Sequence, residues 1–303
     1  MALCSALLLW PRGAIAASIG ERRIPTPDSD PAYMALGPDG FVWFTEFYGE
    51  RIARIQRDGR IVEFPLPDGG NPTGIAAGPD GNMWFTEEFG SKVGMISPAG
   101  TFGPEVPLPG MNPFGITAGP DGNLWITGFP DDIARVSLSG EVTEFAAGGN
   151  PVGIATGPDG NLWFARTFPN GAICRITPDG TITTFSLEPD AGPALITAGP
   201  DGNMWFTDQY RDSIGRITMT GEVTDWALTP QSQPVGITTG VHGFMWFTEF
   251  GASRIGRIGP AGVVTEIQTP TANSGPRGIV RGPGDRLFFV EGDANRVGFA
   301  TAT

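Results

Sequence analysis

The sequence is poor in the residues on which many metal-dependent and nucleophilic sites depend. It has one histidine, His242, and two cysteines, Cys4 and Cys174, among 303 residues. A Cys/His metal cluster is therefore excluded. A disulfide framework is excluded as well, because Cys4 lies in a segment that we expect to be removed and only Cys174 would remain. An isolated cysteine on a strand is predicted to be a small core residue.

Basic residues and long apolar runs are also scarce. The chain has 19 basic and 32 acidic residues, which gives a formal net charge of −13. Nucleic acids and anionic membranes both require a basic surface, so neither is expected as a partner. After the first residues no stretch approaches the length of a membrane-spanning helix. We expect a monomer whose partner is a small molecule or a protein.

The first residues have the composition of an export signal. Residues 2–10 form a short apolar run, and Ala14-Ile15-Ala16 has the small-x-small pattern of a cleavage site, although Arg12 follows the apolar run instead of preceding it. We therefore predict a signal peptide over residues 1–17 and a secreted or periplasmic protein. The rest of the chain, residues 18–303, is predicted to be one domain.

What the sequence has in abundance is one repeated segment. The stretch GPDGNMWFTE at Gly78 to Glu87 recurs with small changes six more times. Its central position is occupied by Trp43, Trp84, Trp125, Trp163, Trp205, Trp246 and Phe288. The intervals of 38 to 42 residues between these positions lie in the range of propellers and solenoids.

Each repeat has the pattern of four short strands. In the repeat that begins at Asn71, strands are expected at residues 72–77, 82–86 and 92–96 and in a last segment ending at Pro109, with glycine-containing turns at 78–81 and 97–100. Four antiparallel strands make one blade, so the sequence predicts an all-β, seven-bladed β-propeller. The repeated tryptophans are predicted to pack between adjacent blades.

The last repeat is one strand short. The chain ends on Arg296 to Ala300, which matches a third strand, and residues 21–27 match the outermost-strand pattern of residues 265–270. We therefore predict that the N-terminal strand completes the last blade. This pairing closes the ring and removes two exposed sheet edges.

This topology assigns the loops to two faces. The loops between second and third strands, here called tips, share one face with the connections between blades; we call it the tip face. The Gly-Pro-Asp-Gly turns and the turns between third and fourth strands share the other, the turn face. The blade connections vary most, so we expect a binding site at the centre of the tip face. The residues predicted to point at the mouth of the axis are Ala32, Thr73, Phe114, Val152, Ala194, Val235 and Arg277.

A second ring of candidates closes the second strand of each blade. Its members are Glu46, Glu87, Gly128, Arg166, Asp208, Glu249 and Glu291. The acids could bind a cation or perform acid–base chemistry. Alternatively, they could form cross-strand ion pairs, because a base follows each glutamate five residues later: Arg51, Lys92, Arg254 and Arg296. We favour ion pairs for the ring as a whole. Glu249 and Glu291 are kept as site candidates because they are expected to flank Arg277.

The single histidine is not a candidate for the site. His242 occupies the aspartate position of a Gly-Pro-Asp-Gly turn, in the segment Gly240 to Gly243. Such a turn lies on the turn face, opposite the expected site. We predict an exposed turn residue without a catalytic role.

The repeated GPDGNxWFTE, together with IGRI at residues 214–217 and 255–258 and VTEF at 142–145, resembles the streptogramin B lyase family, also called virginiamycin B lyases. The resemblance covers all seven repeats and implies a seven-bladed propeller. For the true lyases it also implies a metal-assisted elimination, with magnesium as the possible cofactor, that opens a cyclic depsipeptide antibiotic at its ester bond.

The resemblance also indicates where catalytic residues belong. The family's lyases have histidines after the first-strand prolines of the last two blades, where this chain has Val235 and Arg277. The family's catalytic glutamate corresponds, within about a residue, to Glu291, which is the candidate catalytic residue. Arg277 stays protonated and cannot act as a base. Arg277 and Arg296 are predicted to favour the charged form of Glu291 and to weaken its basicity.

Three functions remain open. The first is an exported propeller without enzymatic activity that binds a ligand through Arg277, Glu249, Val235, Phe114 and Thr73. The second is a carbon–oxygen lyase that linearises a type B streptogramin with Glu291. The third, a sugar-lactone hydrolase, requires acidic and amide ligands around an axial metal, whereas the inner strands offer mainly glycine, alanine, isoleucine and threonine. We rank binding first and the lyase second.

Overall fold

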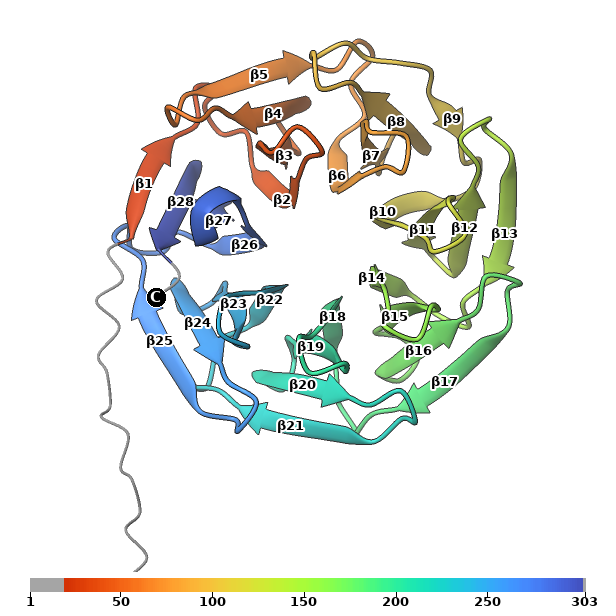
Figure 1. Ribbon diagram of the computed structural model, residues 1–303, viewed down its shortest axis with the longest axis vertical. Coiled ribbons are helices and arrows are strands. Elements are labelled where there is room, and N and C mark those ends of the chain that lie inside the picture. The colour runs from red at the N-terminus through yellow and green to blue at the C-terminus, as the bar shows by residue number, and fades with distance from the viewer. Residues whose placement is uncertain (1–18, 302–303) are drawn as a thin grey trace, which may run out of the picture.

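The computed structural model describes residues 19–301 and consists of seven four-stranded antiparallel sheets around a central axis (Figure 1). The predicted signal peptide over residues 1–17 lies outside the described residues. Within residues 19–301 no helix is long and apolar enough to cross a membrane. The predicted all-β, seven-bladed propeller is confirmed.

The strands of each blade are ordered from the axis outward. The first strands are β2 (Pro31–Leu36), β6 (Pro72–Ala77), β10 (Asn112–Ala118), β14 (Pro151–Thr156), β18 (Pro193–Ala198), β22 (Pro234–Thr239) and β26 (Pro276–Arg281). The second strands are β3 (Val42–Glu46), β7 (Met83–Glu87), β11 (Leu124–Phe129), β15 (Leu162–Arg166), β19 (Met204–Asp208), β23 (Met245–Glu249) and β27 (Arg286–Glu291).

The two outer layers follow in the same order. The third strands are β4 (Arg51–Ile55), β8 (Lys92–Ile96), β12 (Asp132–Val136), β16 (Ala172–Ile176), β20 (Ser213–Ile217), β24 (Arg254–Ile258) and β28 (Arg296–Thr301). The fourth strands are β5 (Ile61–Pro65), β9 (Val106–Pro107), β13 (Val142–Ala146), β17 (Ile182–Ser186), β21 (Val223–Ala227), β25 (Val264–Gln268) and β1 (Gly20–Arg23). A short 3-10 turn, η1 (Pro283–Asp285), precedes β27.

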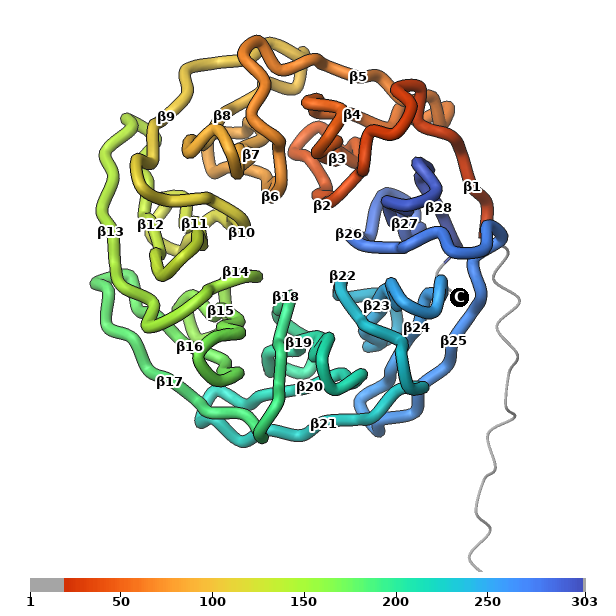
Figure 2. Tube along the Cα trace, turned by 180° about the vertical axis from the view of Figure 1, so that it is seen from behind, coloured from red at the N-terminus to blue at the C-terminus, as the bar shows by residue number. Residues whose placement is uncertain are grey.

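The N-terminal strand closes the ring as predicted. β1 pairs with β28, with Gly20 opposite Phe299 and Arg23 opposite Arg296, and it lies in the outer circle between β25 and β5 (Figure 2). The paired strand covers residues 20–23 rather than 21–27, because prolines at positions 25 and 27 have no N–H to donate to a ladder. Ile24, which follows the strand, is buried in the core.

The repeated tryptophans fill the spaces between blades, as expected. Trp43 is fully buried and packs with Ile75, Met83 and Phe85 of the next blade. Its indole N–H is satisfied by the turn aspartate of its own repeat, and this bond recurs around the ring. The pairs are Trp43 with Asp39 at 3.2 Å, Trp84 with Asp80 at 3.1 Å, Trp125 with Asp121 at 3.1 Å, Trp163 with Asp159 at 3.1 Å and Trp205 with Asp201 at 3.0 Å. Cys174 is also a buried core residue.

A threonine on the second strand connects each of five blades to the next one. Its hydroxyl donates to the backbone carbonyl of the residue that follows the first-strand proline of the neighbouring blade. The bonds run from Thr45 to Thr73 at 2.7 Å, from Thr86 to Phe114 at 2.7 Å, from Thr127 to Val152, from Thr207 to Val235 at 2.8 Å and from Thr248 to Arg277 at 2.6 Å. These bonds fix the backbone of the residues predicted to line the axis mouth.

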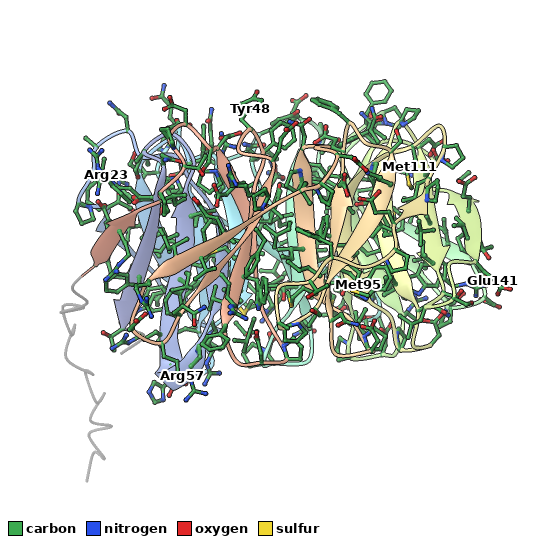
Figure 3. The ribbon with its side chains drawn as sticks, turned by 90° about the horizontal axis from the view of Figure 1, so that it is seen from above. Arg23, Tyr48, Arg57, Met95, Met111 and Glu141 are labelled. Carbon is green, nitrogen blue, oxygen red and sulfur yellow. The ribbon has the colours of Figure 1, made fainter. Side chains whose placement is uncertain are left out.

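The assignment of loops to two faces is confirmed. Figure 3 shows the tip residue Tyr48 and the blade-connection residue Met111 on one face, and Arg57 from the turn between β4 and β5 on the other. His242 is exposed in the turn between β22 and β23, which belongs to the turn face.

Candidate functional site

Arg277 stands at the start of β26, on the tip-face end of the axis. Its guanidinium is 2.8 Å from the Asp30 carboxylate and 3.6 Å from the Asp293 carboxylate. It also lies over the ring of Phe250, 5.4 Å from the ring centre. The two acids and the ring hold the guanidinium in place. Its positive charge is already paired with two carboxylates in the chain without a ligand.

Phe114 and Thr73 lie at the same level of the axis. The Phe114 ring meets Tyr33 edge-on at 5.5 Å and Phe129 at 5.6 Å. The Thr73 hydroxyl donates to the Glu88 carboxylate at 3.1 Å. The structure thus brings two of the predicted ligand-binding residues together with Tyr33, Glu88 and Phe129, none of which the sequence had singled out.

Tyr33 and Leu195 narrow the axis. Five blades have a glycine two residues after the first-strand proline, and blades one and five have Tyr33 and Leu195 there instead. Both line an axial cavity of about 210 Å³. Burial raises the pKa of the Tyr33 phenol above its ordinary value, so the hydroxyl stays protonated. The absence of glycine at these two positions is visible in the repeat and is the sequence signal for this narrowing.

The axial cavity is too small for a large ligand. Pockets for drug-sized molecules usually measure roughly 300–1,000 Å³. Val235 is half-buried at the rim, and its backbone carbonyl is held by Thr207. A large ligand would therefore lie across the mouth of the cavity, in contact with the tips.

The tips present exposed aromatic rings. Four of them occupy the second residue after the end of the second strand: Tyr48 (68% exposed), Phe89 (66%), Phe168 (63%) and Tyr210 (70%). Phe47 lies behind them and contacts Tyr48 and Phe89, with ring centres 5.0 and 5.7 Å apart. Phe47 thus connects the rings of blades one and two, whereas Phe168 and Tyr210 belong to blades four and five. We call these four residues the aromatic tips.

The predicted cross-strand ion pairs form in only one of four blades. Each glutamate lies opposite its base in the strand register, as expected. Among these facing pairs, however, only Glu87 and Lys92 lie within ion-pair distance, at 3.4 Å. Arg254 instead reaches Glu266 on the outermost strand at 2.9 Å, and Arg296 reaches Glu21 at 3.8 Å. The long basic side chains continue outward, whereas the shorter glutamates point between the blades.

The four glutamates are completely buried. In blade two, the blade connection covers Glu87 so closely that a Cβ on Gly70 would collide with its carboxylate. Burial raises the pKa of Glu46 to about 8 and the pKa values of Glu87, Glu249 and Glu291 to about 7.

We predicted that Arg277 and Arg296 favour the charged form of Glu291 and weaken its basicity. Arg296 does act in that direction, but the net shift of the Glu291 pKa is upward, so the predicted weak basicity is wrong. Burial, the largest influence, raises its pKa to about 7, and the effects of Ser274 and Arg296 in the opposite direction are smaller. Arg277 is engaged by Asp30 and Asp293 instead. Glu249 and Glu291 are buried, and Arg277 is paired with neither. The guanidinium packs instead against Phe250 and beside Gly292, the residues that directly follow the two glutamates.

The described residues do not fit a magnesium site at the axis. Magnesium requires several oxygen ligands around open space. Asp30 and Asp293 converge on the Arg277 guanidinium, which already supplies the positive charge between them. In residues 19–301 no group of three or more histidine, cysteine, aspartate or glutamate side chains is placed to hold a metal ion.

Sequence comparison agrees with the repeat. The pattern described as "Virginiamycin B lyase family" matches residues 12–147 and 130–303. The chain belongs to the virginiamycin B lyase family. No curated protein sequence matches it closely enough to count as similar.

Solved structures of this family are close in shape. A streptogramin B lyase structure is 34% identical, with a TM-score of 0.89, over 95% of this chain and 98% of that one. Another similar structure is that of a catalytically inactive histidine-to-alanine variant of virginiamycin B lyase from Staphylococcus aureus, solved with quinupristin. It is 33% identical, with a TM-score of 0.89, and the match covers 95% of this chain and 100% of that one. A gluconolactonase from Xanthomonas campestris shares the fold alone. It is 13% identical, with a TM-score of 0.59, and the match covers 91% of this chain and 86% of that one.

Proposed function

We propose that this member of the virginiamycin B lyase family binds a ligand on its tip face without opening an ester bond. The observation that carries the proposal is the environment of Arg277. It occupies a position where the family's lyases are expected to have a histidine, and its guanidinium is already paired with Asp30 and Asp293. At this position of the rim the chain therefore has a guanidinium held by two carboxylates, whereas elimination requires a group that accepts a proton.

The rest of the rim supports the same conclusion. Elimination requires a group that removes the Cα proton beside the ester. Val235, at the second expected histidine position, has no proton acceptor in its side chain. Glu291 has a suitable pKa of about 7, but its side chain is completely buried between blades. A ligand at the axis mouth would not meet it in this arrangement.

The chemistry of the tip face suggests the class of ligand. The aromatic tips offer rings for stacking. Around the axis, Asp30, Asp293 and Glu88 carry three negative charges against the single positive charge of Arg277. Such a surface favours a neutral or cationic compound with aromatic groups. A type B streptogramin is the first compound to test, because the related lyase was solved with quinupristin.

The test is calorimetric titration of the purified chain with quinupristin, followed by mass spectrometry. We expect saturable binding and no mass-neutral opening of the ring. Tyr48→Ala combined with Phe89→Ala should weaken binding by roughly tenfold or more, since stacking with aromatic rings contributes about 0.5–1.5 kcal/mol per pair. Val263→Ala is the matched control, because Val263 is 67% exposed on the turn face. Equal losses in the control and the double variant would contradict the proposal.

The alternative function is carbon–oxygen lyase activity on the same antibiotic. The raised pKa of Glu291 favours it, because a carboxylate with a pKa of about 7 is a stronger base than an ordinary glutamate. Linearisation of quinupristin by the unmodified chain, lost in Glu291→Gln, would establish this alternative. If the unmodified chain is inactive, the pair Val235→His and Arg277→His tests whether two imidazoles restore turnover.

We also propose that the protein acts outside the cytoplasm. The proposal rests on the apolar run and the small-residue cleavage pattern within residues 1–17. The mature chain should begin near Ala17 or Ser18, which N-terminal sequencing of the exported protein would check.

A further inference from the structure

A cavity of the turn face lies between the last and first blades. It measures about 530 Å³ and is lined by residues of blade seven, including Phe288 and Phe299, and of blade one, including Phe41. Turn residues Gly40 and Gly284 also line it, so it opens toward the turn face. We call it the seam cavity. Its volume is within the range of sites for small molecules.

The cavity is lined by residues of blade seven that replace a stack of three side chains found in blade one. In blade one, Trp43 stacks on Phe64 of the outermost strand at 5.6 Å, and Arg54 of the third strand lies 5.0 Å from the Trp43 ring. The ring stack recurs in three more blades, as Trp125 on Phe145, Trp163 on Phe185 and Trp205 on Trp226.

The strand register shows what replaces this stack in blade seven. Phe288 stands in place of the tryptophan, and Phe299, directly opposite it, stands in place of the arginine. Arg22, opposite Val297, stands in place of the outermost aromatic residue. A smaller ring and an exposed arginine leave the space between the blades unfilled.

A bond between neighbouring blades is missing at the same place. Arg54 donates to the carbonyl of Pro98 in the next blade, and Arg135 donates to the carbonyl of Pro178 at 2.9 Å. The corresponding acceptor for blade seven would be Arg57, in the turn between β4 and β5. The Phe299 side chain has no donor for this carbonyl. The Arg22 guanidinium of the outermost strand lies against Gly59 of the same turn instead.

Three arginines surround the opening without acidic partners. Arg22, Arg57 and Arg286 all line the cavity and are exposed. Within residues 19–301 none of the three lies within 4.0 Å of a carboxylate oxygen. Asp58 also lines the cavity, but its carboxylate is 2.6 Å from Arg60. This local excess of positive charge is unusual in a chain with a net charge of −13.

We propose that the seam cavity binds an amphipathic carboxylate. The apolar part of the ligand would lie among Phe41, Phe288 and Phe299. Its carboxylate would pair with the guanidinium groups at the opening, which bind carboxylates through two parallel hydrogen bonds. The site is on the opposite face from the aromatic tips and is independent of the function proposed there.

The experiment compares octanoate with 1-octanol by calorimetric titration of the full chain. The two probes share an eight-carbon chain and differ in charge. We expect one octanoate per chain, bound roughly tenfold more tightly than 1-octanol, because hydrogen bonds between charged groups are the strong ones. Equal affinity for the two compounds, or no saturable binding of octanoate, would overturn the proposal.

Two substitutions and a matched control locate the site. Arg22→Gln and Arg286→Gln should each weaken octanoate binding by roughly tenfold. Arg23→Gln removes the same charge from the neighbouring exposed residue, which does not line the cavity, and should leave binding unchanged. Equal effects of Arg22→Gln and Arg23→Gln would assign binding to general surface charge and overturn the site.

Phe288→Trp tests the cavity itself. It restores the residue found at this position in the other six repeats and fills part of the space. The variant should fold, as judged by its melting temperature, and lose octanoate binding. A folded variant that binds octanoate like the unmodified chain would contradict the proposal. Unchanged quinupristin binding by Arg22→Gln would separate this site from the tip face.

Discussion

The two faces of the propeller differ in how closely they follow the repeat. On the turn face, an aspartate accepts the tryptophan N–H in five blades, with distances of 3.0 to 3.2 Å. On the tip face, the residue that closes the second strand is a glutamate in four blades and glycine, arginine or aspartate in the others. The repeat is kept where it holds neighbouring strands together, and it varies where loops can form a site.

The exceptions on each face are informative. The turn face departs from the repeat most strongly in blade seven, and the seam cavity opens there. The tip face keeps its buried glutamates, whose raised pKa values show that burial disfavours their charged form. The features to test are therefore the departures from the repeat on the turn face and the buried carboxyl groups on the tip face.

The largest loss of stability is expected when β1, the strand that closes the ring, is removed. Deletion of residues 18–28 removes β1 and the buried side chain of Ile24, and leaves the edge of β28 unpaired. We expect the melting temperature to fall by about 10 °C or more, since roughly 2–4 °C is lost per kcal/mol in a large domain. A chain that begins at residue 18 is the control. Melting within about 2 °C of that control would show that closure is not required.

The second largest loss of stability is expected from a substitution of the repeated aspartate on the turn face. Asp121→Ala removes the acceptor for the Trp125 indole N–H, at 3.1 Å, and for two donors of Asn123. An unpaired buried donor costs about 1–3 kcal/mol, so we expect a loss of about 2 kcal/mol in urea unfolding. Glu141→Ala, an exposed change on the same face, should cost less than about 0.5 kcal/mol. Similar losses in both variants would remove the distinction between repeated and variable positions.

The tip face should show a dependence on pH with a definite sign. The folded-state pKa of Glu46, about 8, lies above its ordinary value of 4.5, so the folded chain holds this proton more tightly than the unfolded chain. Stability is then greatest below pH 4.5 for this group and falls as the pH rises through about 8.

Glu46→Gln tests this dependence. The uncharged amide should raise the free energy of unfolding at pH 8.5 by roughly 4–5 kcal/mol, because each unit of pKa difference is equivalent to about 1.4 kcal/mol. At pH 4 the variant and the unmodified chain should be equally stable. Glu50→Gln is the control, because Glu50 is an exposed residue of the same tip. A variant that is less stable at pH 8.5 than at pH 4, relative to the unmodified chain, would reverse the predicted sign.

The smallest effect is expected at His242. The indole N–H of Trp246 has no hydrogen-bond partner, because His242 replaces the aspartate that accepts this bond in five other blades. His242→Asp should stabilise the chain by about 0.5 kcal/mol by providing the acceptor. Thermal unfolding of the two proteins checks the sign. Loss of ligand binding in His242→Asp would contradict its placement away from the site.

The ring itself could be predicted because it depends on local patterns repeated along the chain. The period of Trp43 to Trp246, the glycine-rich turns and the missing strand after residues 296–300 determine the blades, their number and the closure. Because successive strands of a blade run in opposite directions, their order also assigns the loops to two faces. None of these inferences requires a distance between side chains.

The candidate site was predicted only in part, for an identifiable reason. Arg277, Phe114 and Thr73 were placed at the axis by their position after a proline. Their partners Asp30, Glu88 and Asp293 come from other blades or tips, and sequence spacing does not show which of these side chains meet.

Charge state and empty space were decided by the tertiary structure. The sequence places Glu291 opposite Arg296, but only the folded chain shows that a blade connection covers the glutamate and that its pKa rises to about 7. Likewise Phe288 is visible as a departure from the repeat, whereas the seam cavity requires Arg22, from the other end of the chain, to lie opposite Val297. Burial and cavity volume depend on every neighbour at once, and a repeat specifies only the neighbours within its own blade.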